Sequence, residues 1–169
     1  MERIPTESWD EHKGHIKRYQ YAASRIPKDS VVNDIACGIG YGSEILSSAK
    51  YRGYDLPGIP NSEIFNGEFI GVDLNDDEWI PKRADFTICF ETLEHVLYPK
   101  ILAEKIGNST SIAIFVSVPI VPTMHLNPHH FSDFSKEEIP PMFKGFYVED
   151  EWEQPEEFSH VWELRRSAT

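Results

Sequence analysis

The sequence predicts an α/β fold, in which helices cover both faces of an open and mostly parallel sheet. Short β-branched segments alternate with segments of helical periodicity along most of the chain, which is the pattern of repeated strand–helix units. The first β-branched segment is followed at once by a glycine-rich turn, as at the opening of such a unit. The chain then closes with two segments that alternate apolar and polar residues, which favours an antiparallel pair at one edge.

The first half of the chain is predicted to contain one long helix and the start of the sheet. Apolar residues recur at spacings near three and four over 9–26, which predicts an amphipathic helix that Pro27 ends. Residues 31–36 form a β-branched run typical of a strand, and residues 43–50, after the glycine turn, have a helical composition. Three further strands are predicted at 51–55, 69–73 and 85–90.

The second half of the chain supplies the centre and the far edge of the sheet. Residues 93–106 have helical periodicity that Pro99 interrupts, and the apolar run 111–118 is typical of a central strand covered on both faces. The segment 135–138 has capping-box spacing and predicts a short helix. The terminal antiparallel ribbon is predicted from the alternating segments 146–149 and 160–164.

Composition and charge exclude several classes of protein. With 40% apolar residues, no internal repeat and no long uncharged stretch, the 169 residues predict one globular domain without a membrane-spanning helix. The 16 basic and 28 acidic residues give a net charge of −12, which disfavours binding to nucleic acids and to anionic membranes. Cys37 and Cys89 stand in apolar runs, and the first residues lack the apolar core of a signal peptide. We therefore expect a cytoplasmic protein.

The glycine-rich turn spans 34–42, with the sequence Asp-Ile-Ala-Cys-Gly-Ile-Gly-Tyr-Gly. Glycines at a strand-to-helix turn let the backbone approach a ligand closely, which favours a nucleoside-like cofactor. The spacing G-x-G-x-G differs from the G-x-G-x-x-G of dinucleotide sites and so disfavours pyrophosphate binding. For the turn alone, a tight connection without a ligand is the alternative. Asp55 favours the cofactor, because a carboxylate at the end of the next strand can accept hydrogen bonds from both ribose hydroxyls.

Together these residues resemble the class I S-adenosylmethionine-dependent methyltransferases, in the branch that acts on small molecules or sugars. The glycine turn is similar to the family's first motif, and Asp55 and Asp73 match the acids that end its second and third strands. Residues 90–99 are similar to the family's fourth strand and the helix after it. Further likeness lies in Glu11-His12, Arg18-Tyr19, Ala22-Ala23, Ser117-Val118-Pro119, Asn127-Pro128-His129-His130 and Phe134-Ser135.

The resemblance implies a Rossmann-like, seven-stranded sheet of order 3-2-1-4-5-7-6 and one bound S-adenosyl-L-methionine. It implies methyl transfer from this cofactor to oxygen, nitrogen or carbon of a small-molecule acceptor. One methyltransferase domain over 1–169 is expected, and its parts are a leading helix over 9–26, a cofactor-binding core over 30–118, and a substrate-side loop with the C-terminal strands over 119–166.

The same resemblance assigns parts of the cofactor to particular residues. The expected assignments are the methionine and ribose to Gly38 and Gly40, the amino group to Asp34, the ribose hydroxyls to Asp55, the adenine to Asp73 and Leu74, and the methionine end to Glu91 and Thr92. The rest of the predicted cofactor shell is Ala36, Cys37, Leu56 and Tyr19, with Tyr19 closing the pocket from the leading helix. Cys37 is expected to act by packing, since no second cysteine stands at C-x-x-C spacing.

Histidines are the candidate catalytic residues, because imidazole titrates near neutrality and can accept a proton from a hydroxyl acceptor. The candidates are His95, His129 and His130, and the alternatives for them are packing at a helix end or a surface loop. A set of His125, His129, His130 and Asp133 has suitable metal ligands but no compact zinc-site spacing, so no metal is expected.

The stretch 56–68 departs from the family, because its prolines and glycines cannot form the helix expected between strands two and three. One face of the sheet is therefore reduced there, which leaves room for a homodimer to cover it. No insertion is large enough for a separate recognition domain, so the acceptor should be small or presented by another protein. Two alternatives to the enzyme remain, a catalytically silent S-adenosylmethionine-binding protein and a nicotinamide-dependent oxidoreductase.

Overall fold

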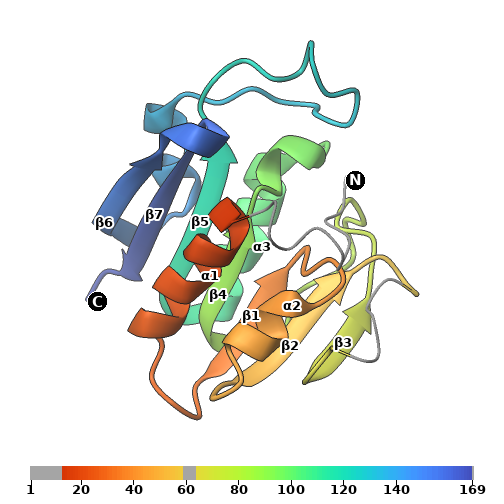
Figure 1. The fold of residues 1–169 in the computed structure, drawn as a ribbon, viewed down its shortest axis with the longest axis vertical. Coiled ribbons are helices and arrows are strands. Elements are labelled where there is room, and N and C mark those ends of the chain that lie inside the picture. Colours follow the sequence, from red (N-terminus) through yellow and green to blue (C-terminus); the bar gives the residue numbers. More distant parts are fainter. Residues whose placement is uncertain (1–12, 59–63, 169) are drawn as a thin grey trace.

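One seven-stranded sheet organises the chain in the computed structural model, which describes residues 13–58 and 64–168 (Figure 1). The strand order is β3-β2-β1-β4-β5-β7-β6, as the sequence predicts. The first five strands run parallel, β7 is antiparallel to β5, and β6 is antiparallel to β7. The strands are β1 (Val31–Ile35), β2 (Lys50–Asp55), β3 (Glu68–Gly71), β4 (Ala84–Phe90), β5 (Thr110–Pro119), β6 (Phe146–Gln154) and β7 (Ser159–Arg166).

Within 13–58 and 64–168, three α-helices cover the sheet. α1 (Lys13–Arg25) and α2 (Tyr41–Ile45) lie on one face, and α3 (Pro99–Ser109) lies on the other (Figure 1). None of the helices within the described residues is long and apolar enough to cross a bilayer. The short 3-10 helices among the described residues are η2 (Leu93–His95), η3 (Lys136–Glu138), η4 (Pro140–Met142) and η5 (Pro155–Glu157).

The observed elements confirm most of the predicted ones and correct several boundaries. The predicted helix over 93–106 is divided into η2 and α3, because Pro99 cannot continue a helix that precedes it and instead starts α3. The helix predicted over 43–50 is the short α2, and the predicted capping box of 135–138 starts a single 3-10 turn. Residues 9–12 of the predicted leading helix lie outside the described residues. The described parts of 56–68 contain no helix.

Two apolar clusters lie on opposite faces of the sheet because the central strands are buried on both sides. On one face, Tyr19 and Ala22 of α1 pack with strand residues such as Phe86 and Phe115. On the other face, Leu102 and Ile106 of α3 pack with Trp162 and other strand residues. In β5 every residue from Ala113 to Val118 is buried, as expected for the apolar run in its sequence. The two clusters hold the central strands in place from both sides.

Polar contacts bind α1 to the hairpin of β6 and β7, although the two segments lie at opposite ends of the chain. The guanidinium of Arg18 donates to Gln154 Oε1 at 2.7 Å, and the hydroxyl of Tyr21 donates to Asp150 Oδ2 at 2.9 Å. Arg25 forms an ion pair with the same Asp150 carboxylate at 2.9 Å. The leading helix is therefore held over the sheet by the last two strands.

The turn between β1 and α2 needs glycine at two positions for different reasons. Gly38 has φ +56° and Gly40 has φ +96°, both in the left-handed region. A Cβ at residue 38 would meet no atom within 4 Å, whereas one at residue 40 would overlap the ring of Phe65. The turn is held against β2 by the amides of Ala36 and Cys37, which donate to the Tyr54 carbonyl at 2.8 and 3.1 Å.

This pair of glycines gives a matched test of the turn. We expect Gly38→Ala to cost about 1–2 kcal/mol of unfolding free energy, the price of a left-handed alanine. Gly40→Ala should cost about 1–3 kcal/mol more, because its methyl group also overpacks against Phe65. Urea unfolding followed by circular dichroism measures both. Equal losses in the two variants would show that Phe65 does not restrict the turn.

Candidate active site

Two adjoining cavities open at the carboxyl ends of the parallel strands. The larger has a volume of about 490 Å³ and is lined from α1, the glycine turn, the end of β4 with η2, the loop after β5, and η5. The smaller has a volume of about 220 Å³ and is lined from the ends of β2 and β3 and from His95, Val96, His129 and Phe131. Asp55 and His95 line both cavities, so the two share a wall. In open α/β sheets this edge is where ligands bind.

Asp55 ends β2 at the junction of the two cavities. Its side chain is buried, and its Oδ2 accepts the amide of Gly38 at 2.9 Å. Its Oδ1 accepts the amide of Leu56 at 2.7 Å. An ionised carboxylate has about four acceptor positions, so Asp55 can still accept hydrogen bonds from a ligand. The carboxylate of Asp55 is therefore held in place in the wall that the two cavities share.

Asp34 is also fully buried, but it does not line either cavity. Its Oδ2 accepts the hydroxyl of Tyr19 at 2.8 Å and the hydroxyl of Tyr51, whereas its Oδ1 has no hydrogen-bond partner. Burial raises the pKa of Asp34 to about 7, against the opposing effect of the two tyrosine hydroxyls. Tyr19 lines the larger cavity, so the hydrogen bond from its hydroxyl connects Asp34 to the wall of that cavity.

Arg18 is a fully buried cation in the wall of the larger cavity. Its Nη1 lies 3.8 Å from Glu91 Oε1, and its Nη2 lies 3.8 Å from Glu157 Oε2. Its Nη1 donates to Gln154, whereas its Nε and Nη2 find no hydrogen-bond acceptor among the described residues. Buried guanidinium groups normally have their donors satisfied. An anionic group of a ligand in the cavity would supply the missing acceptors.

Glu91 follows β4 in a strained position that fixes its carboxylate. Its φ of +47° lies in the left-handed region, and its amide donates to the Ser117 carbonyl at 3.0 Å. Its two carboxylate oxygens accept the hydroxyls of Ser117 at 2.7 Å and Ser159 at 2.8 Å. Ala36 and Phe158 also have positive φ and line the same cavity. Strained backbone of this kind gathers at ligand sites.

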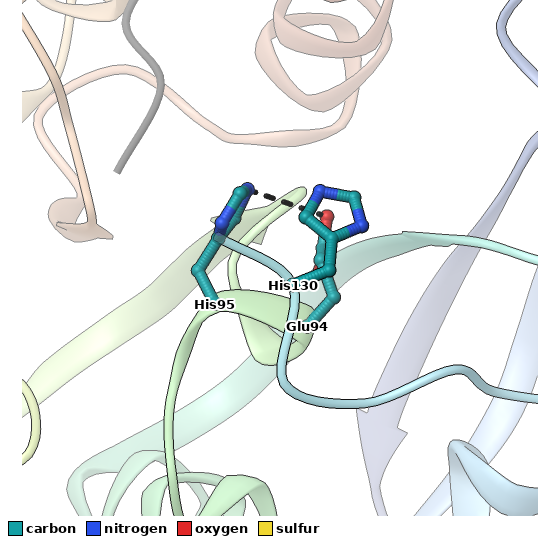
Figure 2. A group of neighbouring side chains, drawn as sticks. All are labelled: Glu94, His95 and His130. Carbon is teal, nitrogen blue, oxygen red and sulfur yellow. Dashed lines mark ion pairs between the residues drawn. The ribbon is translucent and has the colours of Figure 1, made fainter. Parts of the chain in front are cut away.

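The predicted histidines are brought together with a glutamate that the sequence analysis did not select. His95 and His130 line the larger cavity, and their rings lie edge to face with centroids 4.5 Å apart. His129 lines the smaller cavity, and its carbonyl is 3.0 Å from His95 Nδ1. Glu94 points at the same place, as Figure 2 shows, with one oxygen 4.0 Å from His95 Nε2. Burial, followed by the charge of Glu91, raises the pKa of Glu94 well above its usual range.

The predicted cofactor shell divides between the two cavities. Six of its residues line the larger one: Tyr19, Ala36, Cys37, Gly38, Asp55 and Glu91. Leu56, Asp73 and Leu74 line the smaller one, together with Asp55. Asp34, Gly40 and Thr92 line neither, and their predicted contacts with a cofactor stay predictions. Cys37 is buried, and burial raises the pKa of its thiol, which agrees with a packing role.

Two functional candidates were missed from the sequence. Arg18 stood only as part of the Arg18-Tyr19 pair in the leading helix, and a polar residue on a helix face is usually solvated. Glu94 is separated from Glu91 by two residues, which places both near one end of β4, and this spacing was the available signal. Neither signal separates a buried charged side chain from an exposed one. The burial of Arg18 and Glu94 depends on distant segments, the loop after β5 and η5.

Comparison with models of known protein families and with curated proteins finds no match. Solved structures do match across nearly the whole chain. The N-methyltransferase NodS of Bradyrhizobium japonicum WM9, crystallised with S-adenosyl-L-homocysteine, superposes with a TM-score of 0.77 at 12% identity, over 97% of this chain and 92% of its own. Magnesium protoporphyrin IX methyltransferase (ChlM) of Synechocystis PCC 6803, also with S-adenosyl-L-homocysteine, gives 0.70 at 15% identity, over 99% and 90%.

The chain has the class I methyltransferase fold. A putative methyltransferase of Haloferax volcanii, in complex with the activator Trm112, has the same fold with a TM-score of 0.67, at 15% identity over 98% of this chain and 99% of its own. The strand order and the antiparallel ending that the sequence predicts are those observed in this chain. At these identities the likeness establishes the architecture, and the chemistry has to be argued from the site.

The buried Asp34 predicts a pH dependence of stability. Its pKa is about 7 in the folded chain against an ordinary value of 3.8, so between these values the folded chain holds a proton that the unfolded chain has released. Stability contributed by Asp34 therefore falls as pH rises through this interval, by roughly 1.4 kcal/mol per pH unit at most, and is constant above it.

Asp34→Asn removes this titration. We expect the unfolding free energy of the variant, relative to the unaltered protein, to rise by a few kcal/mol between pH 4 and about pH 8. Urea unfolding at a series of pH values measures the difference, with the exposed Asp77→Asn as the control. Parallel pH curves for Asp34→Asn and the unaltered protein would contradict the raised pKa.

Proposed function

We propose that the protein is a methyltransferase, which moves the methyl group of S-adenosylmethionine to a small acceptor molecule. The observation that carries the proposal is the position of Asp55, a buried carboxylate bonded to the glycine turn where the two cavities meet. A nucleoside with a long substituent at its 5′ carbon needs this arrangement, because its ribose lies between the base and the substituent. Carboxylates at this strand end suit ribose hydroxyls.

The smaller cavity suits the adenine. Leu56 and Leu74 offer apolar surface to a flat base, and Asp73 and Asn75 offer polar groups to its edge. Small-molecule sites commonly combine apolar walls with a few polar groups that fix orientation. Asp55 lies in the shared wall, so a base in the smaller cavity would bring its ribose to this carboxylate.

The larger cavity suits the methionine part. Its wall contains Arg18, with donors that lack acceptors, and the cofactor's α-carboxylate would supply them. Asp55 and Glu91 in the same wall favour the positive charges of the cofactor's sulfonium and amino groups. Tyr19, bonded to Asp34, would pack against this part of the cofactor from α1.

The transfer itself is an in-line displacement at carbon, and the protein contributes mainly alignment and exclusion of water. The acceptor's nucleophilic atom attacks the methyl carbon, and the carbon–sulfur bond breaks with its electron pair going to sulfur. The residues of the larger cavity opposite the glycine turn, among them His95, Asn127 and His130, would surround the acceptor. Either histidine could take the proton of a hydroxyl acceptor, as predicted from the sequence.

Several features of the chain support a small acceptor and a cytoplasmic setting. The loop between β5 and η3 has no inserted domain that could recognise a macromolecule, and the net charge of −12 disfavours nucleic acid. Cys37 and Cys89 are buried free thiols, which suits a reducing compartment. A homodimer that covers the reduced face of the sheet beside β3 remains part of the proposal.

Removal of Asp55 tests the nucleoside part of the proposal. Because charge-assisted hydrogen bonds contribute about 1.5–3 kcal/mol each, Asp55→Asn should weaken binding of S-adenosylhomocysteine by roughly 10- to 1,000-fold. Isothermal titration calorimetry measures the dissociation constant, and Asp77→Asn serves as the control. If the unaltered protein binds neither S-adenosylmethionine nor S-adenosylhomocysteine at millimolar concentration, the proposed function is wrong.

Arg18 is tested with two ligands that differ in one part. Arg18→Met should weaken binding of S-adenosylhomocysteine about 10- to 150-fold, because it loses a charge-assisted contact with the carboxylate. Binding of 5′-methylthioadenosine, which lacks the carboxylate and the amino group, should change little. Equal weakening for both ligands would mean that Arg18 supports the fold of the site without contacting the carboxylate.

Transfer is then separated from binding alone. Methyl-labelled S-adenosylmethionine is incubated with the protein and a fractionated metabolite extract, and label is sought in each fraction. Label in a small-molecule fraction supports the enzyme, whereas tight cofactor binding without transfer to any fraction favours the silent binding protein. Saturable binding of NADH that S-adenosylhomocysteine does not displace would favour the oxidoreductase.

A further inference from the structure

Glu94, His95 and His130 form a cluster of metal-ligand type in the wall of the larger cavity (Figure 2). One ligand atom from each residue lies within 4.8 Å of the others. Glu94 and His95 come from η2, and His130 comes from the loop after β5. The backbone joins these two segments directly, because the amide of Phe131 donates to the Glu94 carbonyl at 2.7 Å. This backbone hydrogen bond therefore holds the segment that carries His130 beside the segment that carries Glu94 and His95.

Both histidine rings are held by their Nδ1 atoms. The Nδ1 of His95 lies 3.0 Å from the carbonyl of His129, and a carbonyl only accepts, so this nitrogen bears the proton. The Nδ1 of His130 is 2.6 Å from the hydroxyl of Thr123, which in turn donates to Asp133 Oδ1 at 3.3 Å. Histidines that bind metals are typically fixed in this way, with the second nitrogen as the ligand.

Glu94 supplies an independent observation that points to a ligand. The residue is 1% exposed, and its Oε2 has no hydrogen-bond partner in the part of the chain that the structure describes. A buried carboxylate without partners is costly unless it is protonated, paired or bound to a metal. Its nearest cation in the wall, Arg18, is already close to Glu91 and Glu157. The other oxygen of the Glu94 carboxyl group, Oε1, lies 4.0 Å from His95 Nε2, and Glu94 lines the same cavity as the two oriented imidazoles.

We propose that Glu94, His95 and His130 bind one divalent first-row transition metal ion, with coordination positions left open toward the cavity. Two imidazoles and one carboxylate suit Zn²⁺, Fe²⁺ or Co²⁺, and three protein ligands with open positions are typical of catalytic sites. Ligand atoms at about 2.1 Å from a tetrahedral ion lie roughly 3.4 Å apart. The ligand atoms, which now lie within 4.8 Å of one another, thus need to approach by at most about 1.4 Å. This set differs from the one weighed from the sequence, of which only His130 belongs to the cluster.

The metal ion also limits the chemical class of the acceptor molecule, an inference that rests on the proposed methyl transfer. An acceptor hydroxyl that coordinates the ion loses its proton more readily, because the positive charge stabilises the oxygen anion. The oxygen then bonds to the methyl carbon while the carbon–sulfur bond breaks toward sulfur. The products are a methyl ether, a neutral thioether and one proton released to solvent, so that with the ion bound His95 and His130 act as ligands and not as the proton acceptor. The proposal therefore assigns the acceptor to hydroxyl-bearing small molecules, with oxygen as the methylated atom.

The test titrates the chelator-treated full-length protein with CoCl₂ and ZnCl₂. Visible absorption reports the ligands around Co²⁺, and calorimetry reports the Zn²⁺ affinity. We expect one equivalent of each ion to bind, with a loss of at least tenfold in affinity in His130→Asn and in Glu94→Gln. His125→Asn is the matched control, since this exposed histidine stands in the same loop outside the cluster. His95→Asn serves as a further ligand variant if either of the first two fails to fold.

Binding of S-adenosylhomocysteine, measured on the same samples, separates this proposal from the proposed function. If the cofactor product binds but neither ion does, or if His130→Asn and His125→Asn bind Co²⁺ equally, the metal site is wrong and the methyltransferase is untouched. If the ions bind through the cluster but S-adenosylhomocysteine does not bind, the site stands and the methyl transfer fails. Transfer of label to amine acceptors alone would overturn the assignment to oxygen.

Discussion

The hydrogen bond from the Gly38 amide to the Asp55 carboxylate is the contact on which the arrangement of the site depends. It joins the turn after β1 to the end of β2, and the amides of Ala36 and Cys37 reinforce it by bonding to the Tyr54 carbonyl. Because parallel strands end at the same edge, this short set of bonds defines the wall between the two cavities. Gly38 is needed there because its left-handed backbone aims the amide at the carboxylate.

The second organising feature is an excess of acidic side chains over basic ones around the larger cavity. Among the described residues, its wall contains the carboxyl groups of Asp55, Glu91, Glu94 and Glu157 and the single guanidinium of Arg18. In a partly desolvated site such an excess favours cations far more than it would in water. The proposed sulfonium and the proposed divalent metal ion would both be favoured by this excess, at different parts of one cavity. The strongly negative net charge of the whole chain acts in the same direction.

The sequence was most informative where a single local rule decides the structure. The glycine turn, the acid at 55, the apolar β5 and the proline break at 99 each follow from steric or periodic rules, and all appear where predicted. The cofactor roles came from the resemblance and not from these rules. Arg18 and Glu94 escaped because their burial depends on residues more than 35 positions away, such as Gln154 and Phe131. No local pattern encodes such distant contacts, and α2 was overestimated because helical composition does not fix helix length.

The attachment of α1 to the β6–β7 hairpin has a consequence for how the molecule is made. Arg18 and Tyr21 find their partners 136 and 129 positions later in the chain, so the position of α1 over the sheet depends on contacts between segments far apart in the sequence. Contacts so distant in sequence form slowly, because loop closure precedes any gain from them. During synthesis, α1 is made before the β6–β7 hairpin to which it binds. A nascent chain can assemble its parallel strands early. It completes the wall of the larger cavity only after the β6–β7 hairpin has left the ribosome.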